Sequence, residues 1–129
     1  MQPQNQKSNE MKPMQMQMSG EMEICIKNCL DSYKICSQLL SHCLEKGGKH
    51  AESRHIRLVQ DCATICNLSA DFMLRNSVYH SSTCGVCAEI CIACAESCAA
   101  FSDDEMMMKC SEACRKCATS CEKMGQAKH

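Results

Sequence analysis

Residues 84–98 read CGVCAEICIACAESC and decide the fold. The stretch holds five cysteines, at successive intervals of three, four, three and four residues. An α-helix has about 3.6 residues per turn, so this spacing places all five thiols on one face of a helix. They occupy the a and d positions of a heptad, which usually hold Leu, Ile or Val facing the inside of a bundle. The stretch therefore predicts a helix whose buried face is made of thiols.

The same spacing recurs in three further segments, and together the four segments account for all 15 cysteines. We call each of these stripes a seam. The seam of residues 22–43 consists of Met22, Cys25, Cys29, Ser32, Cys36, Leu39 and Cys43. The next consists of His55, Val59, Cys62, Cys66, Ser69 and Met73, followed seven residues later by His80. The third is the quoted stretch, with Cys84, Cys87, Cys91, Cys94 and Cys98. The last consists of Met107, Cys110, Cys114, Cys117, Cys121 and Met124.

Four seams predict four helices. Gly47 and Gly48 end the first helix, and a capping box of Ser102 and Glu105 starts the fourth. We expect helices over about 20–46, 50–78, 82–101 and 103–124. Short connections predict an all-α, antiparallel up-down-up-down four-helix bundle with a Cys-lined core, spanning residues 20–129. Residues 1–19 are polar and rich in Met and Gln, which indicates a flexible N-terminal tail.

Composition excludes several classes of protein. A chain of 129 residues with net charge -1 has no excess of basic residues for nucleic acid or a membrane surface. An odd number of cysteines in helical periods indicates reduced thiols rather than a disulfide scaffold. The start of the chain lacks an apolar signal segment, and we expect no membrane-spanning stretch. We therefore expect a cytoplasmic protein; the alternative is export, if the chain is a mature form without its leader.

The predicted topology brings the seam ends together at two mouths of the bundle. The start of the first helix, the end of the second, the start of the third and the end of the fourth share one mouth. It gathers Met22, Met73, His80 and Met124, and it also receives the Met-rich tail. The opposite mouth gathers His42, Cys43, His55, Cys98, Phe101, Met106, Met107 and Cys110. Because thioether and imidazole are metal ligands, we expect metal to reach the core through a mouth, and we favour the one beside the tail.

A core of thiols favours a soft metal ion of low coordination number. Structural zinc uses four converging ligands, usually from short loops, whereas these seams offer many adjacent pairs and triples. Cu(I) is the best match. The chain has no cysteine run typical of iron–sulfur proteins. CxxC pairs, which can carry redox chemistry, occur at Cys84/Cys87, Cys91/Cys94 and Cys114/Cys117.

The seams also carry a resemblance. A four-helix bundle with cysteines along every helix, and with Met and His at its mouths, resembles the bacterial copper storage proteins. The resemblance covers about residues 20–124 and is most specific in CGVCAEICIACAESC and CSEACRKCATSC. It implies that many Cu(I) ions bind inside the bundle through thiolates, and that the chains associate as tetramers. Apolar residues outside the seams also indicate a homo-oligomer.

The predicted function is multi-ion Cu(I) binding, storage and detoxification, without catalysis. One alternative is a thiol-based redox or iron–sulfur electron-transfer protein, and another is a copper chaperone or sensor that holds one or two ions. Copper ions and further copies of the chain are the expected partners, with no nucleic acid and no membrane. The predicted metal ligands are all the cysteines named above, together with Met22, Met73, Met124, His55 and His80.

Overall fold

The structure, a computed structural model, describes residues 19–125. It contains four α-helices and one short 3-10 helix, and no strand within those residues. In chain order these are α2 (Gly20–Lys46), η1 (Gly48–Ala51), α3 (Ser53–Leu74), α4 (His80–Ala99) and α5 (Glu105–Gly125). The prediction of a flexible tail over residues 1–19 falls almost entirely outside the described residues.

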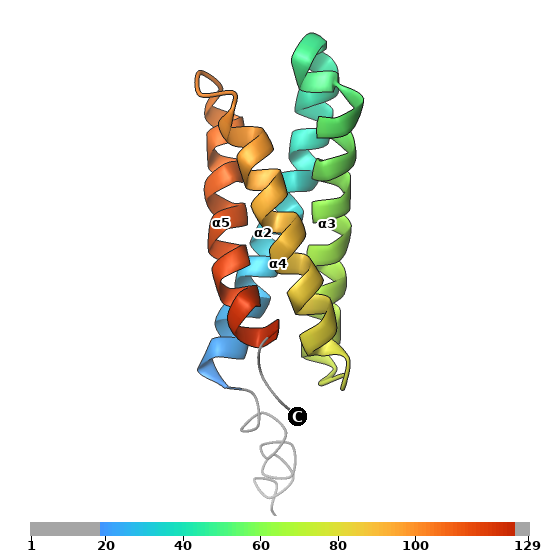
Figure 1. Cartoon of the computed structure of the whole chain (residues 1–129), viewed down its shortest axis with the longest axis vertical. Coiled ribbons are helices and arrows are strands. Elements are labelled where there is room, and N and C mark those ends of the chain that lie inside the picture. Colours follow the sequence, from blue (N-terminus) through green and yellow to red (C-terminus); the bar gives the residue numbers. More distant parts are fainter. Residues whose placement is uncertain (1–18, 126–129) are drawn as a thin grey trace, which may run out of the picture.

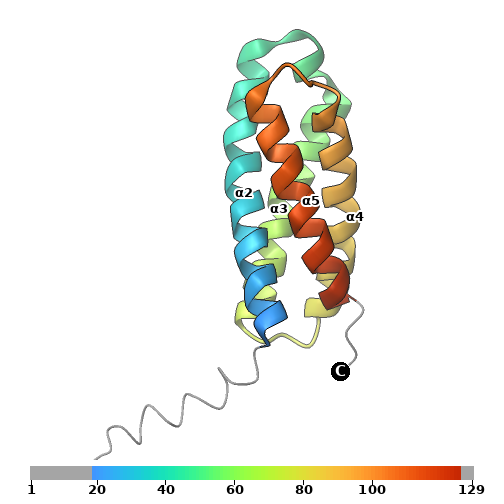
Figure 2. The same ribbon diagram turned by 90° about the vertical axis from the view of Figure 1, so that its left-hand side faces the viewer.

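The helices form the predicted antiparallel four-helix bundle (Figure 1). Helix α2 packs against α3 and α5, and α4 packs against the same two helices. The start of α2, the α3–α4 connection and the end of α5 lie at one end of the bundle, which we call the termini end (Figures 1 and 2). The opposite end carries η1 and the α4–α5 connection, and we call it the η1 end.

Helix α2 has the predicted bounds. The Ser19 hydroxyl accepts a hydrogen bond from the Met22 N–H at 2.9 Å, which satisfies one of the free donors of the first turn. Gly47 ends the helix with a φ of 69°, a backbone conformation that favours glycine. Its N–H donates to the Cys43 carbonyl at 3.1 Å.

Helix α3 is shorter than the predicted 50–78. At its start, the extended backbone of Glu52 separates η1 from α3. At its end, Asn76 has a φ of 56° and donates its N–H to the Met73 carbonyl, while the Ser77 N–H donates to the Phe72 carbonyl. These two bonds form a Schellman motif, which terminates a helix. Asparagine reaches this left-handed conformation more readily than most residues, so it takes the place of the usual glycine.

The start of α5 corrects a second prediction, that Ser102 caps this helix. The cap is Asp104, whose Oδ1 accepts from the N–H groups of Met106 and Met107 at 3.0 and 3.2 Å. The other oxygen of this carboxylate is held by two histidines, an arrangement that the sequence pattern did not include. Helix α4 begins two residues before the predicted 82 and ends two before 101.

The predicted seams are the core. Every cysteine has a relative exposure of 0%, and the other seam positions are also buried. The helices approach closely at the termini end, where a Cβ added to Gly125 would lie 3.0 Å from the backbone of Gly85. A glycine on each helix therefore permits the last turn of α5 to lie against α4.

Helix α4 corrects the expectation that no stretch is apolar enough to span a membrane. Within the described residues it is the helix whose length and composition would allow this. Its five cysteines contribute to that apolar composition, and all five face the core of the bundle. The core helix of a bundle can have this length and apolar composition without spanning a membrane.

Candidate metal centre

The sulfur atoms of the seams form a continuous ladder along the bundle axis. All 15 cysteines are free thiols. Sγ of Cys121 lies 3.5 Å from Sγ of both Cys25 and Cys29. In the middle of the bundle, Sγ of Cys66 lies 3.5 Å from Cys91 and 3.7 Å from Cys87. Two sulfurs on one tetrahedral metal at about 2.3 Å are roughly 3.8 Å apart, so the ladder spacing already suits shared metal ions.

Neighbouring groups of thiols share members. Three sets of four cysteines have all their sulfur atoms within 4.8 Å of one another: Cys29/Cys87/Cys117/Cys121, Cys66/Cys87/Cys91/Cys117 and Cys36/Cys62/Cys94/Cys114. Cys87 and Cys117 belong to two of these sets. The sets therefore cannot all be filled as independent four-thiolate sites, and thiolates that bridge two ions fit the ladder better.

Burial acts against the charged thiolate form of the cysteines in the core. Hydrogen-bonding contact with Cys114, together with burial, raises the pKa of Cys91 well above its ordinary value. Burial, with smaller contributions from Cys98 and Asp104, raises the pKa of Cys43 from 9.0 to about 11. Hydrogen bonds from neighbouring thiols act in the opposite direction at some positions: the contact with Cys117 lowers the pKa of Cys87, and the contact with Cys110 lowers the pKa of Cys114. A metal cation that replaces the proton supplies charge that compensates a buried thiolate.

Four seam positions hold neither cysteine, methionine nor histidine. Ser32 stands close to the ladder, with Oγ 3.5 Å from Sγ of Cys114 and 4.0 Å from Sγ of Cys62. Ser69 is fully buried, and its hydroxyl has no hydrogen-bond partner within the described residues. Leu39 and Val59 are fully buried as well. The two apolar residues lie one helical turn inward of Cys43 and His55, so on α2 and α3 they separate these ligands from the central thiols.

The η1 end of the ladder carries three different ligand types. Sγ of Cys43 lies 3.4 Å from Nε2 of His55 and 3.7 Å from Sδ of Met107. Burial lowers the pKa of His55, which favours the neutral imidazole that binds metals. Its Nδ1 lies 2.7 Å from the hydroxyl of Ser97. An N–H at Nδ1 donating to Ser97 would fix the ring and leave Nε2 for a metal.

The termini end of the ladder begins with three thiols, those of Cys25, Cys84 and Cys121, whose sulfur atoms lie within 4.8 Å of one another. Four predicted ligands on the neighbouring turns are also buried, with relative exposures of 6% for Met22, 0% for Met73, 6% for His80 and 5% for Met124. Each comes from a helix terminus at this end. Soft ligands therefore lie next to the last thiols of the ladder.

The predicted ligand set includes every thiol, but it leaves out Met107, His42 and His50. Met107 continues the α5 seam, but it was not among the predicted ligands although its sulfur contacts Cys43. His42 and His50, which are not seam residues, both bind the carboxylate of Asp104. The sequence spacing of His42, His50 and Asp104 does not predict that they are in contact. They meet because the connections between helices bring them together at one end of the bundle.

The fold and the ladder define a class of protein, a metal-binding four-helix bundle that holds several soft ions on shared thiolates. Residues 18–126 match the family described as copper storage protein. The chain belongs to this family.

Solved structures agree with that assignment. The protein Nmul_A1745 from Nitrosospira multiformis is 45% identical, with a TM-score of 0.76 over 81% of this chain and 94% of that one. The Cu(I)-bound copper storage protein BsCsp3, from Bacillus subtilis, is 36% identical, with a TM-score of 0.76 over 81% and 98%. A cytosolic copper storage protein from Streptomyces lividans, described during copper loading with five coppers, is 28% identical, with a TM-score of 0.72 over 84% and 95%.

One curated relative also matches. It is the uncharacterized cysteine-rich protein YhjQ of Bacillus subtilis (strain 168), 39% identical over 69 residues. The match covers 54% of this chain and 64% of the relative, which is less than two thirds of the relative's length.

Proposed function

We propose that this protein stores Cu(I) by holding many ions on bridging thiolates along the axis of its bundle. The observation that carries the proposal is the sharing of Cys87 and Cys117 between two sets of four thiols. Shared thiols form a polynuclear array, whereas a chaperone or sensor needs only one isolated site. The proposed role is binding and detoxification, without a catalytic step.

Charge balance favours Cu(I) over zinc in this core. A Zn(II) ion with four thiolates carries a net charge of about −2, and several such units stacked in a dry interior would repel one another. Equal numbers of Cu(I) ions and thiolates are neutral. Thiolate and thioether are also the soft ligands that Cu(I) prefers.

The proposed ligand set follows from burial and contact. It comprises the fifteen cysteines with Met22, Met73, Met124, His55 and His80, to which the structure adds Met107 as a candidate. We propose that the Met and His ligands at the two ends of the ladder pass copper between solvent and the central thiols. These groups bind Cu(I) without first losing a proton, so they can accept an ion before a thiol is deprotonated.

We further propose a homo-oligomer, with the family tetramer as the expected form. Ile24, Leu44 and Leu74 are 58%, 61% and 55% exposed, and Leu30 and Leu68 line a surface cavity of about 470 Å³. Apolar surface of this kind is typical of an interface between identical chains. A cytoplasmic location is proposed from the reduced thiols and from the Streptomyces relative, which is described as cytosolic.

Anaerobic titration of the reduced protein with Cu(I), against a competing chelator and with a parallel thiol count, tests the proposal. Storage predicts uptake on the order of ten ions per chain, close to one for each thiol as bridging thiolates allow. Saturation at one or two ions would instead support the chaperone or sensor alternative. A cycling disulfide or an iron–sulfur chromophore would support the redox alternative.

A further inference from the structure

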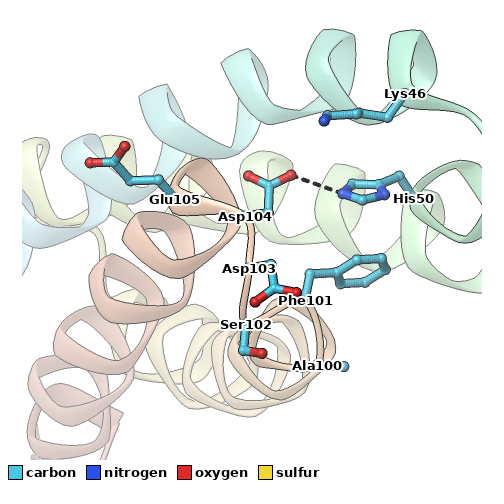
Figure 3. A pocket seen from close by; sticks show the side chains of 8 residues that line it. All are labelled: Lys46, His50, Ala100, Phe101, Ser102, Asp103, Asp104 and Glu105. Carbon is cyan, nitrogen blue, oxygen red and sulfur yellow. Dashed lines mark hydrogen bonds and ion pairs between the residues drawn. The ribbon is translucent and has the colours of Figure 1, made fainter.

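A second group of metal-binding side chains lies outside the seams, at the η1 end. His42 comes from α2, His50 from η1 and Asp104 from the connection before α5. Nε2 of His42 lies 2.7 Å from Oδ2 of Asp104, and Nε2 of His50 lies 2.9 Å from the same oxygen. Figure 3 shows the His50–Asp104 contact. The end of α2, the adjacent η1 and the distant connection before α5 therefore bring two imidazole nitrogens to one carboxylate oxygen.

The surroundings hold these groups in place. The second carboxylate oxygen of Asp104 accepts from the Met106 and Met107 N–H groups, so the helix cap fixes how Oδ2 is aimed. The Phe101 ring packs against the His50 ring, with the centroids 4.3 Å apart. Ligands oriented in advance by neighbouring groups bind a metal more tightly than ligands that must be ordered on binding.

The cluster is also open to solvent and acidic. The side chains of His42, His50 and Asp104 are 23%, 20% and 12% exposed. His50 and Asp104 line a cavity of about 500 Å³, whose lining also includes Asp103, Glu105 and Lys46 (Figure 3). With Asp104, three carboxylates face one ammonium, so a cation is favoured there.

We propose that His42, His50 and Asp104 form a site for one divalent first-row transition metal ion, such as Zn(II) or Co(II), separate from the Cu(I) core. The three donors are borderline or hard and include no sulfur, which suits such ions better than Cu(I). Donors around a tetrahedral ion at about 2.0–2.1 Å are roughly 3.3 Å apart, so the hydrogen-bonded groups need only small shifts. Solvent water would complete the coordination.

Cobalt is a suitable probe because its spectrum distinguishes its ligands. The reduced protein is first filled anaerobically with Cu(I), which occupies the thiols, and Co(II) is then titrated. The proposal predicts one Co(II) per chain, with ligand-field absorption and no sulfur-to-cobalt charge-transfer band. If the chain takes up no Cu(I), the storage function fails on its own, and the loss of ligand-field absorption in D104N and H50N relative to the parent still decides the site.

Variants locate the ion. D104N and H50N are expected to weaken Co(II) binding by on the order of tenfold or more, while asparagine at position 104 still caps α5. D103N is the matched control, because Asp103 lines the same cavity and no hydrogen bond or ion pair joins it to His50 in Figure 3. It removes one nearby charge but no donor, so it should weaken Co(II) binding much less than D104N does. Absence of Co(II) binding, a charge-transfer band, or equal affinity in D104N and the parent would overturn the proposal.

Discussion

Replacing Ser32 by cysteine should increase the copper capacity of the bundle. The Ser32 hydroxyl lies 3.5 Å from the sulfur of Cys114 and 4.0 Å from that of Cys62, within the range of sulfur–sulfur spacings in the ladder. The new thiol would therefore stand in line with its neighbours. It adds one negative charge when metallated, so a neutral array gains about one Cu(I) per chain. Because sulfur and its bond to carbon are larger than oxygen and its bond, the fully buried site must adjust, and the apo protein should lose no more than about 1–3 kcal/mol of stability.

Anaerobic Cu(I) titration with a thiol count measures this gain, and thermal unfolding of the apo protein checks the fold. Ser111→Cys is the matched control: Ser111 is also buried, but its hydroxyl donates to the Ala95 carbonyl at 2.9 Å. It should raise the thiol count without raising the copper capacity. The reasoning is refuted if Ser32→Cys folds, contains the extra thiol and binds no more copper than the parent, or if Ser111→Cys gains as much.

Three further predictions concern the ladder and the helix contacts. Cys117→Ser and Cys43→Ser should each lose about one Cu(I) per chain, as charge balance requires. Cys117→Ser should weaken the binding of the remaining ions more, because the Cys117 sulfur lies within 3.9 Å of three other thiols. Native mass spectrometry counts the ions and chelator competition measures their affinity; equal weakening in the two variants would contradict bridging. Burial raises the pKa of Cys43 from 9.0 to about 11 in the folded apo protein. Between these two pH values the Cys43 thiol keeps its proton in the folded state but loses it in the unfolded state. The stability of the apo protein should therefore fall as pH rises through this window. Chemical denaturation at a series of pH values tests this, and a rise in stability would contradict it. Gly125→Ala should destabilise the protein by about 1–3 kcal/mol, because the new Cβ would lie 3.0 Å from the Gly85 backbone. Gly20→Ala, with nothing within 4 Å of its Cβ, is the control for thermal unfolding and should not destabilise.

Much of the fold could be predicted because the seams are strictly periodic. Four stripes of thiols fixed the number of helices, their buried faces and the all-α class. The helix ends were less predictable. The break between η1 and α3 depends on the extended backbone of Glu52, and the end of α3 depends on the left-handed backbone of Asn76. The periodicity of buried residues carries no information about such individual backbone conformations.

The candidate site was also predictable only in part. Every cysteine was placed correctly in the core, since burial follows directly from heptad position. The contact between His42, His50 and Asp104 could not be predicted, because it depends on how two interhelical connections fold at the η1 end. Ser102 was the expected cap of α5 by pattern alone, while these histidines hold Asp104 in that role.

In the proposed copper-loaded protein, Cu(I) ions lie in a row on shared thiolates inside the bundle. Anomalous diffraction at the copper edge from crystals of the Cu(I)-loaded protein tests it most directly. Shared thiolates predict a series of copper peaks along the bundle axis, with ions on both sides of Cys87 and Cys117. Copper confined to the ends of the bundle, or to one isolated set of four thiols, would contradict it.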